Sequence, residues 1–191
     1  MRLLVLGGTG FIGRHLVAEL LAAGHIVRLA ARDPARGRRM FPACEVVACD
    51  LNRDLEPEDW LPRLAGIDAA INCAGVLQDG RGNDIDAIHR RAPIALFQAC
   101  VEAGVRRVVQ VSALGAGPAS GTAYGASKAA ADEALLALPL EGVVVRPSLA
   151  YTPAGSFGGT SLFRALAATP LLLPLPGGGR QRFQPIAMAD L

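Results

Sequence analysis

A tyrosine and a lysine lie four residues apart, at Tyr124 and Lys128, in a segment with a helical pattern. This spacing puts a phenol and an ammonium on one helix face. A phenol with a pKa of about 10 is a poor acid or base at neutral pH, and a neighbouring cation stabilises its phenolate and lowers that pKa. Ser112, twelve residues upstream, ends an expected strand and offers a hydroxyl for a carbonyl or alcohol oxygen. We predict a catalytic site for hydride transfer with a nicotinamide, in which Tyr124 moves the proton.

A glycine-rich turn near the amino terminus could hold the cofactor for this chemistry. Gly7-Gly8-Thr9-Gly10-Phe11-Ile12-Gly13 stands between an apolar run and an amphipathic segment. Glycine permits positive φ and the close backbone approach that a pyrophosphate requires, and the helix that follows supplies N–H groups and a partial positive charge. We predict a dinucleotide site, the alternative being a turn that serves packing alone. The residues assigned to it are Gly7, Thr9, Gly10, Phe11, Ile12 and Gly13.

The context of the turn also bears on the tyrosine and lysine. A Y-x-x-x-K pair arises by chance on many helices, and the competing interpretation is a half-exposed tyrosine beside a solvated lysine. Because Tyr124 and Lys128 follow both Ser112 and a dinucleotide turn, the sequence favours an active site.

The choice of cofactor depends on a pair of adjacent residues that follow the second expected strand. A carboxylate about 20 residues after the glycine motif would bond a ribose 2′-hydroxyl, whereas an arginine there would pair with a 2′-phosphate. The sequence has both, as Arg32-Asp33. Because Arg32 lies nearer the strand end, we predict that NADP(H) is preferred over NAD(H). The alternative is that Asp33 caps a short helix while the arginines form a solvated face, which leaves NAD(H) open.

Short apolar runs alternate with helical patterns along the first 147 residues. Expected strands cover 2–6, 26–31, 45–49, 67–72, 107–112 and 142–146, and expected helices cover 11–23, 55–64, 83–103 and 122–137. This alternation is typical of βαβ units, so we predict an α/β fold, a Rossmann-type doubly wound parallel sheet flanked by helices.

The remaining residues form a different kind of segment. Residues 148–179 are rich in Pro, Gly, Ser and Thr around one expected short helix, 162–168. We expect residues 1–147 to form an NAD(P)-binding domain and residues 148–191 a partial substrate-binding region packed on it. Since Asp190-Leu191 resembles a helix start, we expect the chain to be truncated or a fragment of a longer protein.

Composition excludes several classes of function. The 191 residues are 51% hydrophobic and 19% charged, which argues against disorder, and a net charge of +2 leaves no extended basic face for nucleic acid. No apolar stretch is long enough to span a membrane, and Gly7 ends the first apolar run before a signal peptide can form. Four cysteines lack metal-ligand spacing, so we expect buried thiols, no metal site and a reducing cytoplasm: Cys44, Cys49, Cys73 and Cys100.

Taken together, these residues resemble the short-chain dehydrogenase/reductase superfamily over nearly the whole chain. Further matching segments are Asp50-Leu51, Asn72-Cys73-Ala74-Gly75, Arg146-Pro147-Ser148 and 184–191. The resemblance implies that Tyr124 and Lys128 also touch the cofactor, and it adds the contacts Asp50, Leu51, Cys73, Ala74, Gly75 and Pro147. Within the superfamily, the likeness is to atypical and extended members related to the NDUFA9-like accessory subunit of respiratory complex I and to NmrA-like proteins.

Departures from the family pattern keep more than one function open. His89 stands where extended members carry asparagine, and Ala187 and Ala189 replace common histidine and aspartate residues. We expect His89 to have a structural role on its helix. The leading hypothesis is an NAD(P)-dependent oxidoreductase acting on an unknown small molecule. The rival is a non-catalytic NADPH-binding scaffold or redox sensor, and a third hypothesis is a nucleotide-sugar epimerase or dehydratase. Two assemblies stay open: a homodimer, and association with a membrane complex.

Overall fold

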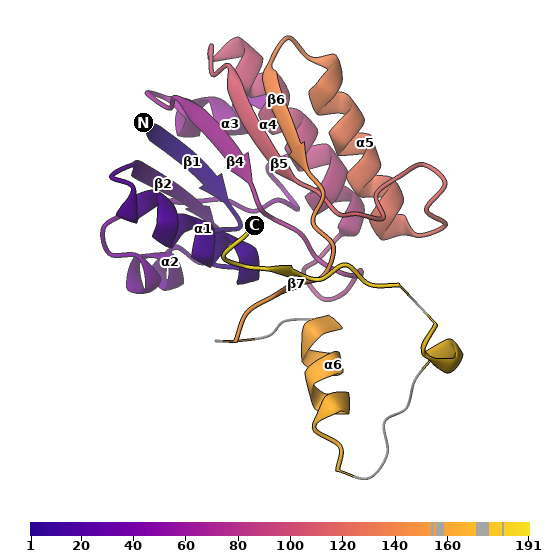
Figure 1. Cartoon of the computed structure of the whole chain (residues 1–191). Helices are drawn as coiled ribbons and strands as arrows, with labels where there is room; N and C mark the ends of the chain where they lie inside the picture. The colour runs from indigo at the N-terminus through magenta and orange to yellow at the C-terminus, as the bar shows by residue number, and fades with distance from the viewer. Residues whose placement is uncertain (154, 156–158, 171–175, 181) are drawn as a thin grey trace. The chain divides into compact units, whose positions relative to one another are not determined.

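Six parallel strands form the centre of the first of two compact units, Met1–Arg146 and Pro147–Leu191, in a computed structural model of the chain (Figure 1). The structure describes all residues except 154, 156–158, 171–175 and 181. The strands are β1 (Arg2–Leu6), β2 (Ile26–Ala31), β3 (Glu45–Ala48), β4 (Ala69–Asn72), β5 (Arg107–Val111) and β6 (Glu141–Val145). Their order, β3-β2-β1-β4-β5-β6, confirms the predicted doubly wound sheet.

Helices cover both faces of this sheet. They are α1 (Phe11–Ala22), α2 (Pro34–Met40), α3 (Pro57–Leu64), the π-helix η1 (Ala87–Arg91), α4 (Ala92–Glu102) and α5 (Ala123–Ala137). Figure 1 shows α1 and α2 on one side of the sheet and α3, α4 and α5 on the other. The strand order reverses between β1 and β4, and ligands of such sheets bind at the carboxyl ends of the strands there.

The central strand β1 shows how alternation builds the two halves of the core. Leu4 and Leu6 pack among the residues of α3, α4 and α5, whereas Leu3 and Val5 pack with α1. All four side chains are at most 5% exposed, as expected for a parallel strand covered on both faces. Trp60 is fully buried and anchors α3 in the first of these clusters.

Two expected elements differ in the structure. Helix α2 follows Asp33, where the sequence analysis placed a short helix only as an alternative. The expected helix 83–103 does not begin at Asn83, because Asn83 pairs with Gly80 across a tight turn. The helical stretch that follows starts at residue 85 and contains the π-helix η1 before it continues as α4.

The second unit contains little regular structure. Its elements are β7 (Ala150–Tyr151), α6 (Gly159–Ala167), the 3-10 helix η2 (Pro176–Gly179) and β8 (Ile186–Ala187). Strands β7 and β8 pair in parallel, with Ala150 opposite Ile186. Within the described part of this unit, Thr160 is the one buried residue, at 6% exposure. In the described part of the chain, no helix is both long and apolar enough to cross a bilayer.

Candidate active site

The glycine turn after β1 is built by backbone contacts that side chains would block. Gly7 has φ of +71°, and a Cβ atom there would lie 2.6 Å from the backbone N of Ala74. A Cβ atom on Gly13 would lie 2.3 Å from the carbonyl O of Gly7. The N–H of Gly10 donates to that same carbonyl at 2.9 Å, which closes the turn. Gly7 and Gly13 are therefore required by the local packing of the chain.

The turn leads directly into the start of α1. Gly10 is the N-cap residue in extended conformation, no side chain caps this end, and the first turn contains no acidic residue. A helix start of this kind attracts anions through its N–H groups and its dipole. The guanidinium of Arg14 lies 5.4 Å from the ring centroid of Phe11, which adds a cation at the same end. The residues present thus fit the pyrophosphate of a dinucleotide.

At the end of β2, Arg32 and Asp33 have different partners. The carboxylate of Asp33 accepts from the N–H of Arg36 at 2.9 Å and caps α2, and this bond holds the pKa of Asp33 below its usual range. Arg32 is not part of that cap, because its Nη1 donates to the carbonyl O of Gly82 at 2.8 Å and to Oδ1 of Asn83 at 3.1 Å. The capping of α2 by Asp33, which is one part of the alternative interpretation, is confirmed.

Asp50 follows β3 and belongs to the same group of loops. Its Oδ1 accepts from the side chain of Asn52 at 2.9 Å, and Nδ2 of Asn52 also donates to the carbonyl O of Gly82 at 3.1 Å. The N–H of Asp84 donates to Oδ1 of Asn52 at 3.0 Å. Asn52 therefore joins the loop after β3 to the loop before η1. Sequence reasoning did not single out Asn52, and its one signal was its place two residues after Asp50.

The segment after β4 is held by a buried amide. Asn72 is 1% exposed, its Nδ2 donates to Oε1 of Gln110 on β5 at 2.8 Å, and its Oδ1 accepts from the N–H of Ala74 at 3.0 Å. This asparagine therefore stabilises the sheet and shapes the chain beside the glycine turn. Cys73 is half-buried, and burial raises the pKa of its thiol to about 12, so it is a neutral packing residue at physiological pH.

Lys128 is the single lysine among the 19 basic residues of the chain. Its ammonium is buried on α5 and donates to the carbonyl O of Ala74 at 3.1 Å and to that of Val111 at 3.0 Å. Burial lowers its pKa to about 8, against the opposing attraction of Asp132. A Cβ atom on Gly75 would lie 3.3 Å from this ammonium nitrogen. The lysine therefore lies at the carboxyl ends of β4 and β5.

The structure corrects the expected state of Tyr124. The phenol is half-buried, and burial raises its pKa, whereas the sequence analysis expected the neighbouring ammonium to lower it. The reason is that burial shields the phenol from water and so disfavours its charged form. Tyr124 therefore keeps its proton at neutral pH.

A buried histidine connects the tyrosine to the loop after β4. Nε2 of His89 accepts from the N–H of Val76 at 2.9 Å, so the ring proton must reside on Nδ1. Nδ1 lies 3.1 Å from Oγ of Ser127, and that hydroxyl donates to the carbonyl O of Tyr124 at 3.0 Å. The rings of His89 and Tyr124 also meet edge to face at 5.1 Å between centroids. These contacts agree with the expected structural role of His89.

Ser112 is held by a different partner from the one expected. Its Oγ donates to Oδ2 of Asp132 at 2.7 Å, and Nη2 of Arg146 reaches the same oxygen at 2.9 Å. Asp132 is fully buried on α5, four residues after Lys128. Sequence reasoning missed Asp132, although the i, i+4 spacing from Lys128 places it on the same helix face.

The other expected contacts divide between the two units. Thr9, Phe11 and Ile12 lie in the glycine turn or at the start of α1, and Leu51 packs against the core cluster of α3 and α4. Pro147 begins the second unit. The first unit therefore brings the glycine turn, Ala74 and Lys128 together.

Comparisons with known proteins agree on a family. The NAD(P)H-binding family profile matches residues 7–158. A protein of Arabidopsis thaliana named NADH dehydrogenase [ubiquinone] 1 alpha subcomplex subunit 9, mitochondrial, is 34% identical over 197 residues, covering 98% of this chain and 47% of that protein. Ceramide reductase of Caulobacter vibrioides is 34% identical over 170 residues, covering 88% of this chain and 52% of the reductase. This chain thus spans about half the length of these relatives.

Solved structures give the same indication. A putative NAD-dependent epimerase/dehydratase from Bacillus halodurans has a TM-score of 0.69 at 26% identity, covering 80% of this chain and 72% of the other. A double mutant of the dTDP-glucose 4,6-dehydratase DesIV from Streptomyces venezuelae, with NAD and DAU bound, has a TM-score of 0.75 at 26% identity. That match covers 100% of this chain and 69% of the other.

Proposed function

This chain belongs to the NAD(P)H-binding family of Rossmann-type proteins like the short-chain dehydrogenases, and on this premise we propose that it is an NAD(P)-dependent oxidoreductase. The observation that carries the proposal is the position of Ala74. Its backbone N lies against the glycine turn at Gly7, and its carbonyl O accepts from the ammonium of Lys128. The cofactor turn and the expected catalytic helix therefore meet at one residue.

Each part of this site receives a role in the proposal. The residues from Gly7 to Gly13 would hold the pyrophosphate, Asp50 and Leu51 the adenine, and Lys128 the ribose next to the nicotinamide. Three residues after β4 and one at the start of the second unit would border the cofactor: Cys73, Ala74, Gly75 and Pro147. Residues 1–147 would thus serve cofactor binding and residues 148–191 substrate binding.

The state of Tyr124 favours reduction of a carbonyl group. A bound reduced nicotinamide supplies a hydride to the carbonyl carbon. Tyr124, which is protonated at neutral pH, would donate the phenolic proton to the carbonyl oxygen. The phenol would then recover a proton from solvent. Ser112 would hold the substrate oxygen, which requires its own proton to turn away from Asp132.

We propose that NADP(H) is preferred over NAD(H). At the end of β2 the carboxylate of Asp33 is engaged as a helix cap, whereas Arg32 presents a guanidinium with five N–H donors, of which Nη1 serves Gly82 and Asn83. A 2′-phosphate would accept from the remaining donors of Arg32. The Arg32-Asp33 pair therefore supports recognition of a 2′-phosphate over recognition of a free hydroxyl.

A second candidate function is an NADPH-binding scaffold or redox sensor without turnover. It is favoured by the 34% identity, over 98% of this chain, to a protein named as a subunit of NADH dehydrogenase. In this case Tyr124 and Lys128 would serve cofactor binding alone, and the protein would join a membrane complex or a homodimer. The cytoplasm is our proposed location, since Cys44, Cys49 and Cys100 are buried free thiols whose pKa values are raised by burial.

Replacing Tyr124 with phenylalanine tests the proposed reaction. With NADPH and a panel of aldehydes, ketones and quinones, loss of reduced-nicotinamide absorbance should identify a substrate for the parent protein. Tyr124→Phe removes the proton donor and should lower kcat by roughly 10²- to 10⁴-fold while NADPH binding is unchanged. Turnover of that substrate by Tyr124→Phe at the parent rate would contradict the mechanism. NADPH binding without turnover of any compound would favour the scaffold.

A further inference from the structure

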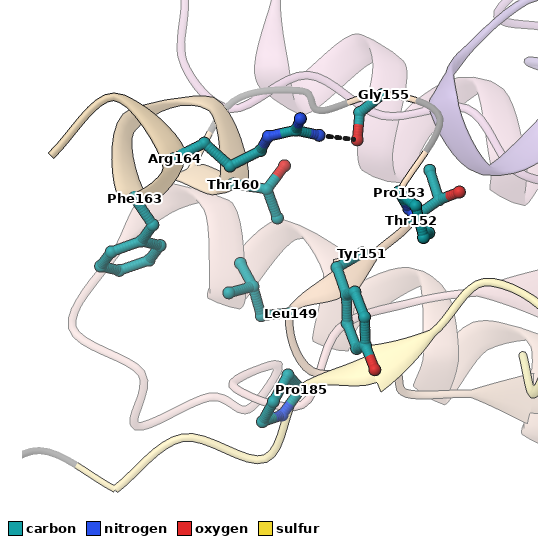
Figure 2. Close-up of a pocket in the computed structure, with 9 residues that line it drawn as sticks. All are labelled: Leu149, Tyr151, Thr152, Pro153, Gly155, Thr160, Phe163, Arg164 and Pro185. Atoms are coloured by element: carbon teal, nitrogen blue, oxygen red, sulfur yellow. Dashed lines mark hydrogen bonds between the residues drawn. The ribbon is translucent and has the colours of Figure 1, made fainter. Parts of the chain in front are cut away.

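The second unit contains a pocket of its own (Figure 2). It is lined by residues of β7 and α6 and by residues that precede or follow these elements in the sequence. The cavity measures about 460 Å³, which lies within the range of roughly 300–1,000 Å³ found for small-molecule sites. Its described walls come from three places in the sequence: residues 149, 151–153 and 155, helix α6, and Pro185 just before β8. All of the lining residues that the structure describes belong to the second unit.

Most of the pocket wall is hydrocarbon. Leu149, Pro153, Phe163 and Pro185 contribute apolar side chains, and Tyr151 adds its ring. Phe163 is 40% exposed, although an aromatic ring of this size is usually buried. The exposed wall therefore suits an apolar ligand.

One end of the pocket carries a positive charge. Arg164 is the single charged residue among the described residues of the lining, and its Nη1 donates to the carbonyl O of Gly155 at 3.2 Å. Figure 2 shows this guanidinium beside Thr160 at one end of the view and Pro185 at the opposite end. Because the guanidinium has five donors and one bond to a protein atom in the described structure, it can also pair with an anion.

The charge of the surrounding sequence supports an anionic group in the ligand. From residue 147 to the end, the basic residues are Arg164, Arg180 and Arg182, and Asp190 is the one acidic residue. No carboxylate lines the described pocket to compete for the guanidinium. The phosphates and hydroxyls of a nucleotide sugar would need many more polar partners than Arg164 and three hydroxyl side chains provide. An apolar molecule with a single anionic group is the better chemical match.

We propose that this pocket binds an amphipathic ligand, a hydrocarbon chain that carries one anionic group such as a carboxylate. Arg164 binds the anionic group, while Leu149, Phe163 and Pro185 contact the chain. This site rests on the proposed assignment of residues 148–191 to substrate binding, but its ligand binding can be measured without redox turnover, since the described lining residues all belong to the second unit. It therefore extends the function of the protein to recognition of a lipid-like acid.

Binding of a fluorescent polyene fatty acid, cis-parinaric acid, to the full chain tests the proposal. Below the micelle concentration of the probe, we expect saturable binding of the acid and weaker binding of its uncharged methyl ester. Arg164→Gln should reduce the affinity for the acid about tenfold, the effect of one charge-assisted hydrogen bond, and should leave the affinity for the ester unchanged. Arg164→Lys keeps the charge and should restore part of the preference for the acid.

Matched variants separate this role from general effects of charge or stability. Arg180→Gln removes an exposed arginine outside the pocket and should bind the acid as the parent does. Phe163→Ala should weaken acid and ester alike, with NADPH binding to the first unit as the check that the protein is folded. Equal affinity of the parent for acid and ester, no saturable binding, or displacement of the probe by UDP-glucose but not by palmitate would each overturn the proposal.

Discussion

The two units of this chain hold their functional side chains in different ways. In the first unit, Lys128, His89 and Ser112 are buried, and each is bonded to the backbone or to a second buried side chain. In the second unit, Phe163 and Arg164 are exposed, and Arg164 is held by one hydrogen bond to a loop carbonyl. The cofactor half is thus preorganised by a sheet, whereas the expected substrate half rests on loops.

This difference matches the division of labour that we propose. A cofactor used for one reaction needs fixed geometry, and strand ends with buried partners provide it. Substrate preference is set on loops positioned by a scaffold, because loops tolerate change without loss of the core. Substitutions in the first unit should therefore reduce stability and binding more than substitutions in the second unit.

The largest effect is expected for Gly7→Ala. The new Cβ atom would lie 2.6 Å from the backbone N of Ala74, and the residue has φ of +71°. Crowding and strain together should cost about 3 kcal/mol or more in the free energy of unfolding and should abolish NADPH binding. Gly24→Ala is the matched control, since Gly24 has φ of +78° with no atom within 4 Å.

Urea unfolding and NADPH titration of both variants check this prediction. Gly24→Ala should cost about 1 kcal/mol from the positive φ alone and should bind NADPH as the parent does. Equal losses of unfolding free energy and of NADPH binding in the two variants would show that the contact between Gly7 and Ala74 contributes to neither.

The next effect is expected for Lys128→Met. We expect kcat to fall about 100-fold or more, while the free energy of unfolding changes by about 1 kcal/mol at most, because relief of ammonium burial offsets two lost hydrogen bonds. Since Lys128 is the single lysine, labelling lysine with ¹³C gives one side-chain signal, which should titrate at a pKa of about 8 in the parent. A signal that titrates at the ordinary value near 10.4 would contradict the buried position of the ammonium.

A pH-dependent effect is expected from His89. Burial lowers its pKa from 6.5 to about 3 in the folded state, with a further contribution from Lys128. The unfolded chain therefore takes up a proton first as the pH falls, and the free energy of unfolding should decrease below pH 6.5 with a slope approaching about 1.4 kcal/mol per pH unit. Below the folded pKa this contribution is fully lost.

Urea unfolding at several pH values between about 7 and 4.5 measures this slope. His89→Gln, which can still accept from Val76 and donate to Ser127, should flatten it. His25→Gln, at a half-buried position outside the site, should leave it unchanged. A parent slope that persists in His89→Gln would assign the pH dependence to other groups.

The smallest effect is expected in the second unit. Phe163 and Phe183 meet edge to face at 5.4 Å between centroids, and their side chains are 40% and 58% exposed. Phe183→Ala should lower the free energy of unfolding by about 1 kcal/mol or less and leave NADPH affinity unchanged. A loss as large as that of Gly7→Ala would show that the second unit is as constrained as the first.

Most of the first unit could be predicted from sequence because its signals are local. The apolar run 2–6, the glycines that follow it and the helical period after them are contiguous, and the strand order follows from repeated βαβ connections. The i, i+4 pair at Tyr124 and Lys128 could be recognised for the same reason.

Other parts of the site depend on contacts between distant residues. The bonds from Lys128 to the carbonyls of Ala74 and Val111 span 54 and 17 positions, and the pKa of Tyr124 is raised by burial, which also depends on the packed structure. The bond from Ser112 to Asp132 spans 20 positions. In the second unit, strands β7 and β8 are two residues each, too short to give a periodic pattern.

Thermal unfolding of the full chain with NADPH or NADH tests the central claim most directly. A cofactor that binds the folded state at about 100 times its Kd should stabilise it by about 2.7 kcal/mol, a shift of several degrees. We predict this shift for NADPH, a smaller one for NADH, and loss of the difference in Arg32→Gln. No shift with either cofactor would contradict the assignment of a dinucleotide site to the glycine turn, and equal shifts in the parent would contradict the role of Arg32.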